Sequence, residues 1–276
     1  MSSPPDLSRH LDIATEAALA AGGLILGIQQ RGVTIEEKRP GDLVTEADRA
    51  SETLIYDILS RHFPESSILM EESGQKGDLA DLQWVVDPLD GTTNFAHGYP
   101  FAAVSIGLLW EGIPVLGVIY DFFHQHLFRA SQGQGATCNR QPIHVSPITE
   151  LSRSLLVTGF AYDRRETADN NYAEFCHLTH LTQGVRRGGS AALDLAYVAW
   201  GKLDGYWERG LSPWDIGAGI VLVQEAGGRV SAYDGSPVDV QSGRLLATNG
   251  HLHGPILTEL ARVQPLGQSF PSQPAS

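Results

Sequence analysis

The stretch of sequence that decides the fold is residues 84–95, which read Trp-Val-Val-Asp-Pro-Leu-Asp-Gly-Thr-Thr-Asn-Phe. The first three apolar residues predict a buried strand that ends in Asp87, and Pro88 fixes the turn that follows. Asp90 then precedes Gly-Thr-Thr, whose amides and hydroxyls suit an anion. Two carboxylates around a rigid proline can converge on a hard cation such as Mg²⁺, which prefers oxygen ligands. The alternative is ordinary turn chemistry, because Asp is common beside Pro and Gly in turns.

The chain before this stretch predicts two helices. Apolar residues at helical spacing predict a helix over residues 7–30. A second helix is expected to open at Thr45 as N-cap, with Asp48 placed as in a capping box, and to stop before Pro64. Residues 74–81 are expected to form a loop.

The chain after this stretch predicts strands first and an alternation of strands and helices later. Strands over 101–110 and 113–121 are separated by Glu111-Gly112, a two-residue connection typical of a hairpin. Further strands are expected over 126–130, 155–159, 203–208, 229–232 and 245–248. Helices are expected over 190–200 and from Ser212 to the glycine pair at 227–228. The pattern predicts layers of helix and sheet.

The composition limits the classes of function. The 276 residues carry 32 acidic and 19 basic side chains, a formal charge of −13, and 42% are hydrophobic. An acidic chain lacks the basic surface that grips nucleic-acid phosphates or anionic lipid. Two cysteines give no disulfide framework, and the N-terminus lacks the order of a secretory signal. The apolar run 101–110 is too short to span a bilayer, so we expect a cytoplasmic protein with a disordered tail over 263–276.

Other acids stand where they could join the pair in residues 84–95. Glu71 follows the apolar residues 68–70, so a second strand is expected to deliver an acid at its end. Asp215 lies in the first turn of the helix that starts at Ser212, where its alternative role is to complement the helix dipole. Asp48 has a similar alternative as a capping acid.

These segments together resemble the inositol monophosphatase family. Residues 87–95 resemble its first signature, and residues 214–219 through 225–228 resemble its second. Residues 42–48 and 71–73 fall in the expected order and spacing. The resemblance covers about residues 7–262 and implies an α+β fold, the layered αβαβα sandwich of the inositol monophosphatase and fructose-1,6-bisphosphatase type. It implies a single domain, 7–262, with an N-terminal α+β lobe (7–149) and a C-terminal α/β lobe (150–262).

The resemblance also implies a role for each site residue. Two or three Mg²⁺ ions would be held by the side chains of Glu71, Asp87, Asp90 and Asp215 and the carbonyl of Leu89. Thr92 and Asp48 match the pair that orients and helps to deprotonate the attacking water, and Glu71 helps to hold that water. The phosphate would meet the amides of Gly91 and Thr92, and the rest of the substrate would meet Gly189, Ser190, Glu208 and Asp215. Two alternatives stay open: Ser190 as a plain N-cap, and Lys38, which matches a family lysine near the metal and phosphate, as an exposed charge.

The implied activity is that of a Mg²⁺-dependent, lithium-sensitive phosphomonoesterase. It would hydrolyse myo-inositol monophosphate to inositol and phosphate by direct in-line attack of a metal-activated water, in a cytoplasmic homodimer with no membrane partner and no direct nucleic-acid binding. Arg209, next to Glu208, is less typical of its position, so the resemblance determines the substrate less closely than the reaction. The alternatives are a related phosphatase acting on fructose 1,6-bisphosphate or histidinol phosphate, and a dual-role regulator of the transcription machinery.

Overall fold

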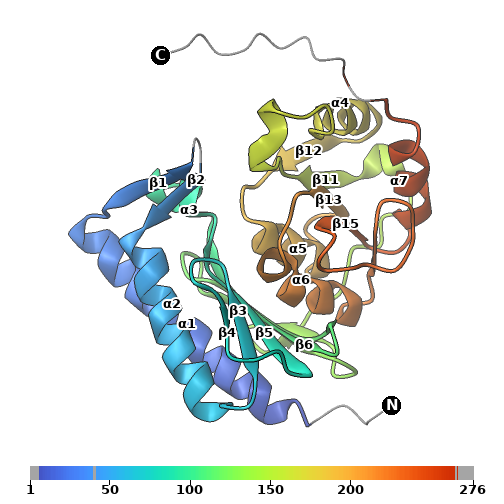
Figure 1. Ribbon diagram of the computed structural model, residues 1–276. Coiled ribbons are helices and arrows are strands. Elements are labelled where there is room, and N and C mark those ends of the chain that lie inside the picture. Colours follow the sequence, from blue (N-terminus) through green and yellow to red (C-terminus); the bar gives the residue numbers. More distant parts are fainter. Residues whose placement is uncertain (1–5, 40–41, 265, 267–276) are drawn as a thin grey trace, which may run out of the picture.

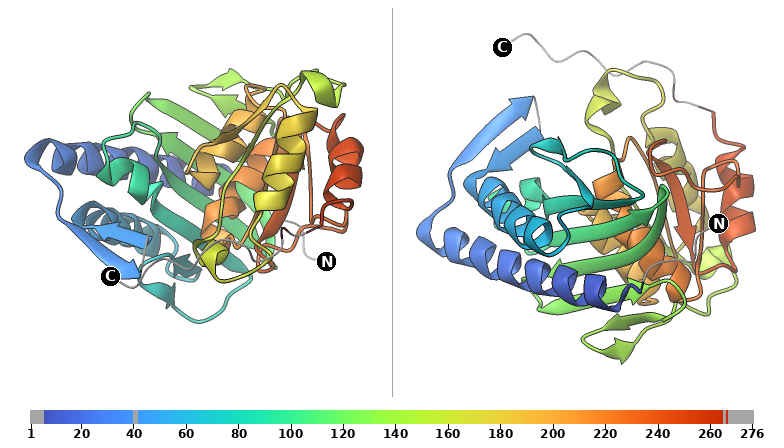
Figure 2. Two further views of the ribbon diagram at one scale, coloured as in Figure 1. Left: turned by 90° about the horizontal axis from the view of Figure 1, so that it is seen from above. Right: turned by 60° about the horizontal axis from the view of Figure 1, so that its bottom comes forward.

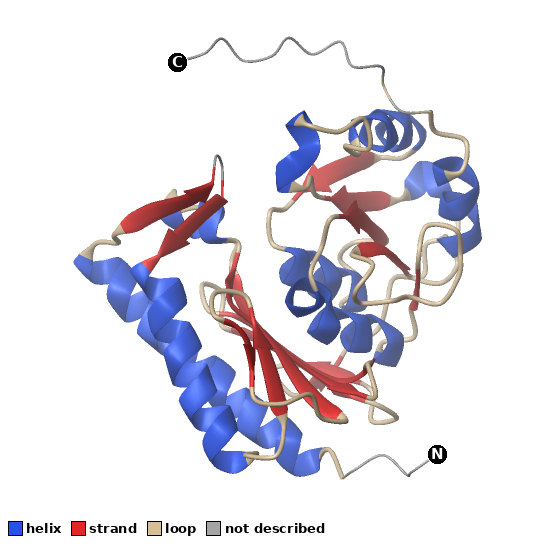
Figure 3. Ribbon diagram, viewed as in Figure 1, coloured by secondary structure: helices blue, strands red, loops and turns tan. Residues whose placement is uncertain are grey.

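The structure is a computed structural model that describes residues 6–39, 42–264 and 266. Its helices and sheets form five layers in the order helix, sheet, helix, sheet, helix (Figures 1 and 3). The layered αβαβα sandwich expected from the sequence is therefore confirmed. Most of the expected tail, at 265 and 267–276, lies outside the described residues.

The first layer consists of two long helices, α1 (Ser8–Arg31) and α2 (Glu46–His62). They run side by side along one face of the first sheet (Figures 1 and 2). By length and composition, α1 is apolar enough to cross a membrane, with a mean hydropathy of 1.6. Its apolar side instead packs in the core formed with α2 and the sheet, where Ala14, Ala21 and Ile25 are fully buried. Burial in the fold accounts for the composition of this helix.

The second layer is an eight-stranded mixed sheet in the order β10-β9-β8-β7-β6-β5-β3-β4. Its strands are β3 (Ser67–Met70), β4 (Gly74–Lys76), β5 (Leu82–Asp90), β6 (Ala103–Trp110), β7 (Ile113–Asp121), β8 (His126–Ser131), β9 (Ala136–Cys138) and β10 (Gln141–Pro142). Strand β5 pairs parallel with β3 and antiparallel with β6. A separate hairpin of β1 (Ile35–Arg39) and β2 (Asp42–Thr45) precedes α2. The sheet ends of β3 and β5 thus deliver Glu71 and Asp87 next to each other.

The third layer is a helix pair shared by the two sheets. Helices α5 (Ala191–Ala199) and α6 (Pro213–Glu225) pack on the face of the first sheet opposite to α1 and α2. Their other side packs on the fourth layer, a five-stranded sheet in the order β12-β11-β13-β15-β14. Its strands are β11 (Leu155–Thr158), β12 (Gly184–Arg187), β13 (Gly205–Arg209), β14 (Arg229–Ser231) and β15 (Arg244–Thr248). One continuous apolar core therefore joins both halves of the chain, and the expected lobe boundary at 149/150 stays a prediction.

The last layer covers the outer face of the second sheet. Helices α4 (Tyr172–Leu181) and α7 (His253–Leu260) enclose a smaller core with Leu156, Trp207 and Leu246. Three shorter helices complete the described chain: α3 (Thr92–Ala96) and the 3₁₀ turns η1 (Leu151–Arg153) and η2 (Tyr162–Arg165).

The predicted helices and most predicted strands are confirmed to within a few residues. Two expectations were wrong. Residues 74–81 contain strand β4, which pairs antiparallel with β3 at the edge of the sheet. Strand β5 does not end at Asp87 but continues to Asp90 through an irregularity, because Pro88 lacks the N–H needed for a regular ladder. Elements with few apolar residues, such as β12, were not predicted.

Helix α6 approaches the first sheet unusually closely. A Cβ atom on Gly117 of β7 would lie 2.2 Å from the carbonyl oxygen of Ala218, and one on Gly107 of β6 would lie 2.8 Å from the Ala218 amide nitrogen. On the helix itself, a Cβ on Gly217 would lie 2.6 Å from a methyl of Val85. Backbone therefore meets backbone between α6 and the sheet, which brings the first turn of α6 to the end of β5.

Gly117→Ala is expected to lower the free energy of unfolding by about 2 kcal/mol or more, because the helix must move away from the sheet. Urea denaturation measures the change. Gly23→Ala is the matched control: Gly23 is exposed on α1 and a Cβ there meets nothing within 4 Å, so it should be neutral or stabilise by up to about 1 kcal/mol. Equal effects of the two substitutions would contradict the close approach.

His253 is a fully buried histidine at the start of α7. Its ring nitrogens lie 2.9 Å from the Ser231 hydroxyl and 3.0 Å from the Thr248 hydroxyl. Burial, aided by the charge of Arg229, lowers the pKa of His253 to about 4. The unfolded chain takes up this proton near pH 6.5, whereas the folded protein does not until about pH 4. His253 therefore makes the protein lose stability as the pH falls through this window.

In His253→Gln, the free energy of unfolding is expected to depend less steeply on pH between about 6.5 and 4 than in the wild type, since this proton uptake is removed. The measurement is the urea midpoint of both proteins across that range. Other titrating groups contribute equally to both, so parallel pH profiles would contradict the assignment.

Candidate active site

Acidic side chains from four elements meet at the end of strand β5 that lies nearest to α3. Asp87 and Asp90 come from β5, Glu71 directly follows β3, Asp215 lies in the first turn of α6, and Asp48 lies in the first turn of α2. Asp48, Asp87 and Asp90 are buried, with 0%, 3% and 8% of their surface exposed. The site is therefore assembled from segments that the fold, not the sequence order, brings together.

The irregularity in β5 decides where its two carboxylates point. Residues three apart in a regular strand face opposite sides of the sheet. Between Asp87 and Asp90 the pairing with β6 shifts, and the Pro88 carbonyl accepts a hydrogen bond from the Ser51 hydroxyl at 2.8 Å. The Leu89 amide donates to the Asp87 carboxylate at 3.0 Å. As a result both carboxylates serve one site, at which the charges of Asp87 and Asp90 interact.

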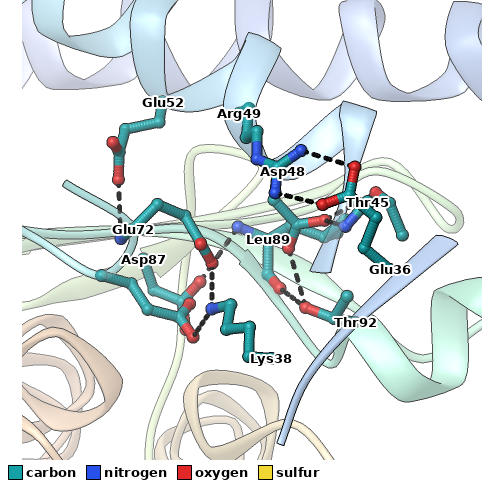
Figure 4. A network of polar contacts seen from close by, with 11 residues as sticks. Glu36, Lys38, Thr45, Asp48, Arg49, Glu52, Glu72, Asp87, Leu89 and Thr92 are labelled. Atoms are coloured by element: carbon teal, nitrogen blue, oxygen red, sulfur yellow. Dashed lines mark hydrogen bonds and ion pairs between the residues drawn. The ribbon is translucent and has the colours of Figure 1, made fainter. Parts of the chain in front are cut away.

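Asp48 connects the start of α2 to the start of α3 (Figure 4). Its Oδ2 accepts the backbone amide of Thr45 at 2.8 Å, which completes the expected capping box. Its Oδ1 accepts a hydrogen bond from the Thr92 hydroxyl at 2.8 Å. The same hydroxyl lies 2.9 Å from the Leu89 carbonyl oxygen. The capping role and the pairing with Thr92 thus occur together in one carboxylate.

Lys38 of strand β1 reaches across to the acids that follow β3. Its Nζ lies 3.3 Å from the Glu71 carboxylate. It also forms an ion pair with Glu72 (Figure 4). The Glu72 amide in turn donates to the Glu52 carboxylate at 2.9 Å. The Lys38 side chain is only 28% exposed. Lys38 is therefore paired with two acids at the site, and its role near the metal and phosphate stays a prediction.

Asp90 and Asp215 are each fixed by hydrogen bonds at a helix start. The Asp90 carboxylate accepts the Ser190 hydroxyl at 2.6 Å and the Ala192 amide at 2.7 Å. The Asp215 carboxylate accepts the Ser212 amide at 2.6 Å. The Ser190 hydroxyl also caps α5 by accepting the Leu193 amide, so the N-cap alternative for Ser190 holds alongside its contact with Asp90.

The electrostatics of the cluster follow from burial and crowding of like charges. Burial, and then the charges of Glu71, Asp90 and Asp215, raise the pKa of Asp87 well above its usual range. Burial raises the pKa of Glu71 to about 7, although Lys38 opposes the shift. Burial likewise raises the pKa of Asp90 to about 6, against the hydrogen bonds from Ser190 and the start of α5. Such a cluster is stabilised by any cation that enters it.

Glu208 lies near the end of β13, where the charge of Asp90 acts on its carboxyl group. It accepts a hydrogen bond from the Tyr206 hydroxyl at 2.7 Å, and burial raises its pKa to about 7. A Cβ on Gly159 would lie 2.1 Å from its carboxylate, so a larger residue there would displace the Glu208 carboxylate from its present position. Gly189 has a φ of +89°, and a Cβ on it would lie 2.4 Å from the Arg187 guanidinium. Gly91 is also constrained, with φ +92° and a Cβ position 2.9 Å from the Phe101 carbonyl.

Asp194 is a neighbouring acid that sequence reasoning did not find. It lies in the first turn of α5 with 2% of its surface exposed, and its Oδ1 has no hydrogen-bond partner among the described residues. Burial and the charges of Glu208 and Asp90 raise its pKa well above the usual range, and Arg187 opposes this. The signal in the sequence was an acid flanked by apolar residues, Ala-Ala-Leu-Asp-Leu-Ala.

The carboxylates are neighbours but do not form a closed ligand set. Across residues 6–39, 42–264 and 266, no three Asp, Glu, His or Cys side chains are gathered tightly enough to hold a metal ion as they stand. Their oxygens are engaged by protein donors, as described for Asp87, Asp90 and Asp215. The arrangement fits hard cations, because its charged donors are all carboxylate oxygens.

Comparisons with known proteins agree with this geometry. The model of the inositol monophosphatase family matches residues 6–264. An inositol-1-monophosphatase of Synechocystis is 60% identical over 261 residues, which cover 94% of this chain and 91% of that protein. The Nus factor SuhB of Escherichia coli is 41% identical, covering 87% of this chain and 91% of that protein.

Solved structures give the same result. The inositol monophosphatase of Anabaena superposes with a TM-score of 0.88 at 59% identity, over 95% of this chain and 99% of that one. The residues that match the family model, 6–264, include both sheets and all the site acids. This chain belongs to the inositol monophosphatase family and is a phosphatase.

Proposed function

We propose that this phosphatase hydrolyses myo-inositol monophosphate to inositol and phosphate with the help of Mg²⁺. The observation that carries the proposal is the group of Glu71, Asp87, Asp90 and Asp215, of which Asp87 and Asp90 are buried, beside the hydrogen-bonded pair Asp48–Thr92. The relative from Synechocystis that is named an inositol-1-monophosphatase supports the choice of substrate.

The residues that would hold Mg²⁺ are Glu71, Asp87, Asp90 and Asp215 through their side chains and Leu89 through its carbonyl oxygen. Burial and the charges of neighbouring acids raise the pKa of Asp87 and Asp215, which supports the binding of cations here, and two or three ions are proposed on the basis of family membership. When bound, Mg²⁺ supplies positive charge that polarises the phosphate and stabilises the leaving oxygen. The acidic surface of the chain is then no obstacle to a phosphate substrate, because the anion meets cations first.

Asp48 and Thr92 are proposed to orient the attacking water and help to remove its proton, with Glu71 holding the water. The Thr92 hydroxyl has one proton and two acceptors, the Asp48 carboxylate at 2.8 Å and the Leu89 carbonyl at 2.9 Å. Donation to the charged carboxylate is the stronger bond, and it turns the oxygen lone pairs of Thr92 outward to accept from water. Burial raises the pKa of Asp48, which makes it a better proton acceptor than an exposed aspartate.

The remaining contacts divide between phosphate and alcohol. The amides of Gly91 and Thr92, at the start of α3, would donate to the phosphate. Gly189, Ser190, Glu208 and Asp215 would contact the hydroxyls of the alcohol, with Glu208 as an acceptor at the base of that side. Attack by water in line with the leaving oxygen then needs no covalent phosphoenzyme.

A second candidate role concerns the transcription machinery. Relatives that are 43% and 41% identical are named Nus factor SuhB, which supports a regulatory role beside catalysis. We also propose a cytoplasmic homodimer that is inhibited by lithium and binds neither membrane nor nucleic acid directly, on the basis of family membership.

Asp90→Asn is expected to lower the Mg²⁺-dependent release of phosphate from myo-inositol 1-phosphate by roughly 100-fold or more, since it removes one charge that would face the metal. Phosphate release at saturating substrate and a range of Mg²⁺ concentrations measures the effect. Asp57→Asn is the matched control, because Asp57 is exposed on α2. A mutant that releases phosphate as fast as the wild type would contradict the metal site. Binding to the transcription machinery that survives the same mutation would support the second role.

Thr92→Val is expected to reduce kcat about 100-fold, because the hydroxyl that links water to Asp48 is lost. Thr92→Ser should retain most activity, since its hydroxyl can donate to the same carboxylate. Asp48→Asn added to Thr92→Val should cost little more than either change alone, because the two residues act as one unit. Additive losses in the double variant would contradict the paired role.

A panel of phosphate esters tests the substrate. Myo-inositol 1-phosphate, fructose 1,6-bisphosphate and histidinol phosphate are compared with and without Mg²⁺, and the highest kcat/KM is expected for the inositol ester. A preference for another ester would contradict the substrate and leave the reaction class intact.

A further inference from the structure

The segment between β11 and α4, residues 159–171, forms one wall beside the site. It follows β11 at the end where the parallel strands β11 and β13 both present their carboxyl termini. Ligands in sheets of this kind bind outside the carboxyl ends of parallel strands. In Figure 1 this segment, which includes η2, lies on the side of the second sheet that faces β1 and β2.

An arginine at the end of β13 fixes this segment. The Arg209 guanidinium donates to both oxygens of Asp163 in η2, at 2.7 and 2.8 Å. Its Nε lies 3.4 Å from the Asp169 carboxylate, which also pairs with Arg244 of the adjacent strand β15. The Arg209 side chain is 15% exposed. A bidentate arginine–carboxylate pair fixes the relative orientation of the two side chains as well as their distance.

Backbone constraints hold both ends of the same segment. Asn171, at φ +68°, donates to the Thr158 hydroxyl and the Gly159 carbonyl, both at 2.7 Å, and accepts from the Trp207 indole. Gly210, directly after Arg209, lies so close that a Cβ on it would be 2.6 Å from the Ala161 Cβ. The segment is therefore held against β13 at several points, and Arg209 fixes its middle.

Tyr162 is the residue that this arrangement presents to the site. It precedes Asp163 in η2 and is 46% exposed. Burial, and then the charges of Asp42, Glu71, Asp215 and Asp87, raise the pKa of its hydroxyl. The helical turn η2 that carries Tyr162 lies across from β1, the strand of Lys38 (Figure 1), so the residue lies in the segment that borders the acid cluster. An aromatic ring with a polar tip can pack on the C–H face of a polyol ring and bond to its hydroxyls.

Arg209 is not itself available to bind phosphate. Both of its forked donors are occupied by Asp163, and a third carboxylate lies beside Nε. A role in the reaction must then pass through the residues it holds. Glu208, its neighbour in β13, is the proposed acceptor for an alcohol hydroxyl. Arg209 therefore connects the end of β13, which carries Glu208, to the segment over 159–171.

We propose that Arg209 is a positioning residue for substrate selection: by binding Asp163 it holds Tyr162 over the site, where the phenol contacts the polyol ring of the substrate. The inference rests on the proposed function, because it names how the same site recognises the alcohol. It assigns selectivity for a ring-shaped polyol to the pair Arg209–Asp163 and to Tyr162, and leaves the chemistry to the acids.

The test compares two esters with the same phosphate and different alcohols, myo-inositol 1-phosphate and the small, flexible glycerol 2-phosphate, in the presence of Mg²⁺. Arg209→Gln, Asp163→Asn and Tyr162→Ala are each expected to raise KM for the inositol ester about tenfold, with kcat and the KM for the glycerol ester within about twofold. The double variant Arg209→Gln/Asp163→Asn should be no worse than either single variant. Tyr162→Phe keeps the ring and removes the hydroxyl, so its KM for the inositol ester shows how much of the effect of Tyr162→Ala comes from each.

The matched control is Arg129→Gln, which breaks another arginine–aspartate pair, Arg129–Asp12 at 3.0 Å, on the far side of the first sheet. It should leave both substrates unaffected. Melting temperatures are measured for every variant, and Tyr162→Ala carries the test if the arginine variant unfolds, because Tyr162 is half exposed.

Two outcomes overturn the inference in distinguishable ways. If the wild type does not prefer the inositol ester, the proposed substrate is wrong and the inference falls with it. If the wild type prefers that ester and the Arg209, Asp163 and Tyr162 variants keep the preference, the proposed substrate stands and the positioning role is wrong.

Discussion

The repulsion between buried carboxylates is the constraint on which the rest of the structure depends. After burial, the charges of neighbouring acids in the group raise the pKa of Asp87 and of Asp215, and the four acids come from three separate segments of the chain. The forces that hold them are ordinary: a helix cap for Asp48, backbone amides for Asp87, Asp90 and Asp215, and an ion pair for Glu71. An unfavourable cluster is thus maintained by many small favourable contacts around it. This is the usual cost of a functional site in a stable fold.

Close packing of the middle helix layer on the first sheet is what allows the acids to meet. Asp215 can reach the end of β5 only because α6 lies directly on the backbone of the first sheet, at Gly107 and Gly117. On its other side the same helix layer supports the strands that carry Glu208. The glycines of the sheet are therefore as much a part of the site as the acids, although they touch no ligand. Both sheets pack on the same helix pair, α5 and α6, and this packing sets the separation between the two halves of the site.

Much of this could be predicted from the sequence, and the rest shows why some of it could not. Long elements with strong periodicity, such as α1 and β7, were predicted because burial imposes a pattern on them. The order of the acids in residues 71–90 and at 215 predicted a common site, and the fold brings them together. Strand β4 was missed, since a short polar edge strand has no pattern of its own. Asp194 and the Arg209–Asp163 pair were missed because they depend on contacts between residues 46 positions apart or on burial from all sides.

The shared middle layer has a consequence for how such an enzyme can diversify. The acids proposed to handle the phosphate come mainly from the first sheet and its connections, whereas the residues proposed for the alcohol side, Glu208, Arg209 and the segment over 159–171, belong to the second sheet. A change in the loops of the second sheet can alter the shape offered to the alcohol while the phosphate-handling side remains intact. The fold thus separates the residues proposed to handle the phosphate from those proposed to contact the alcohol. Relatives that catalyse the same reaction can therefore come to accept different alcohols through substitutions on the second sheet alone.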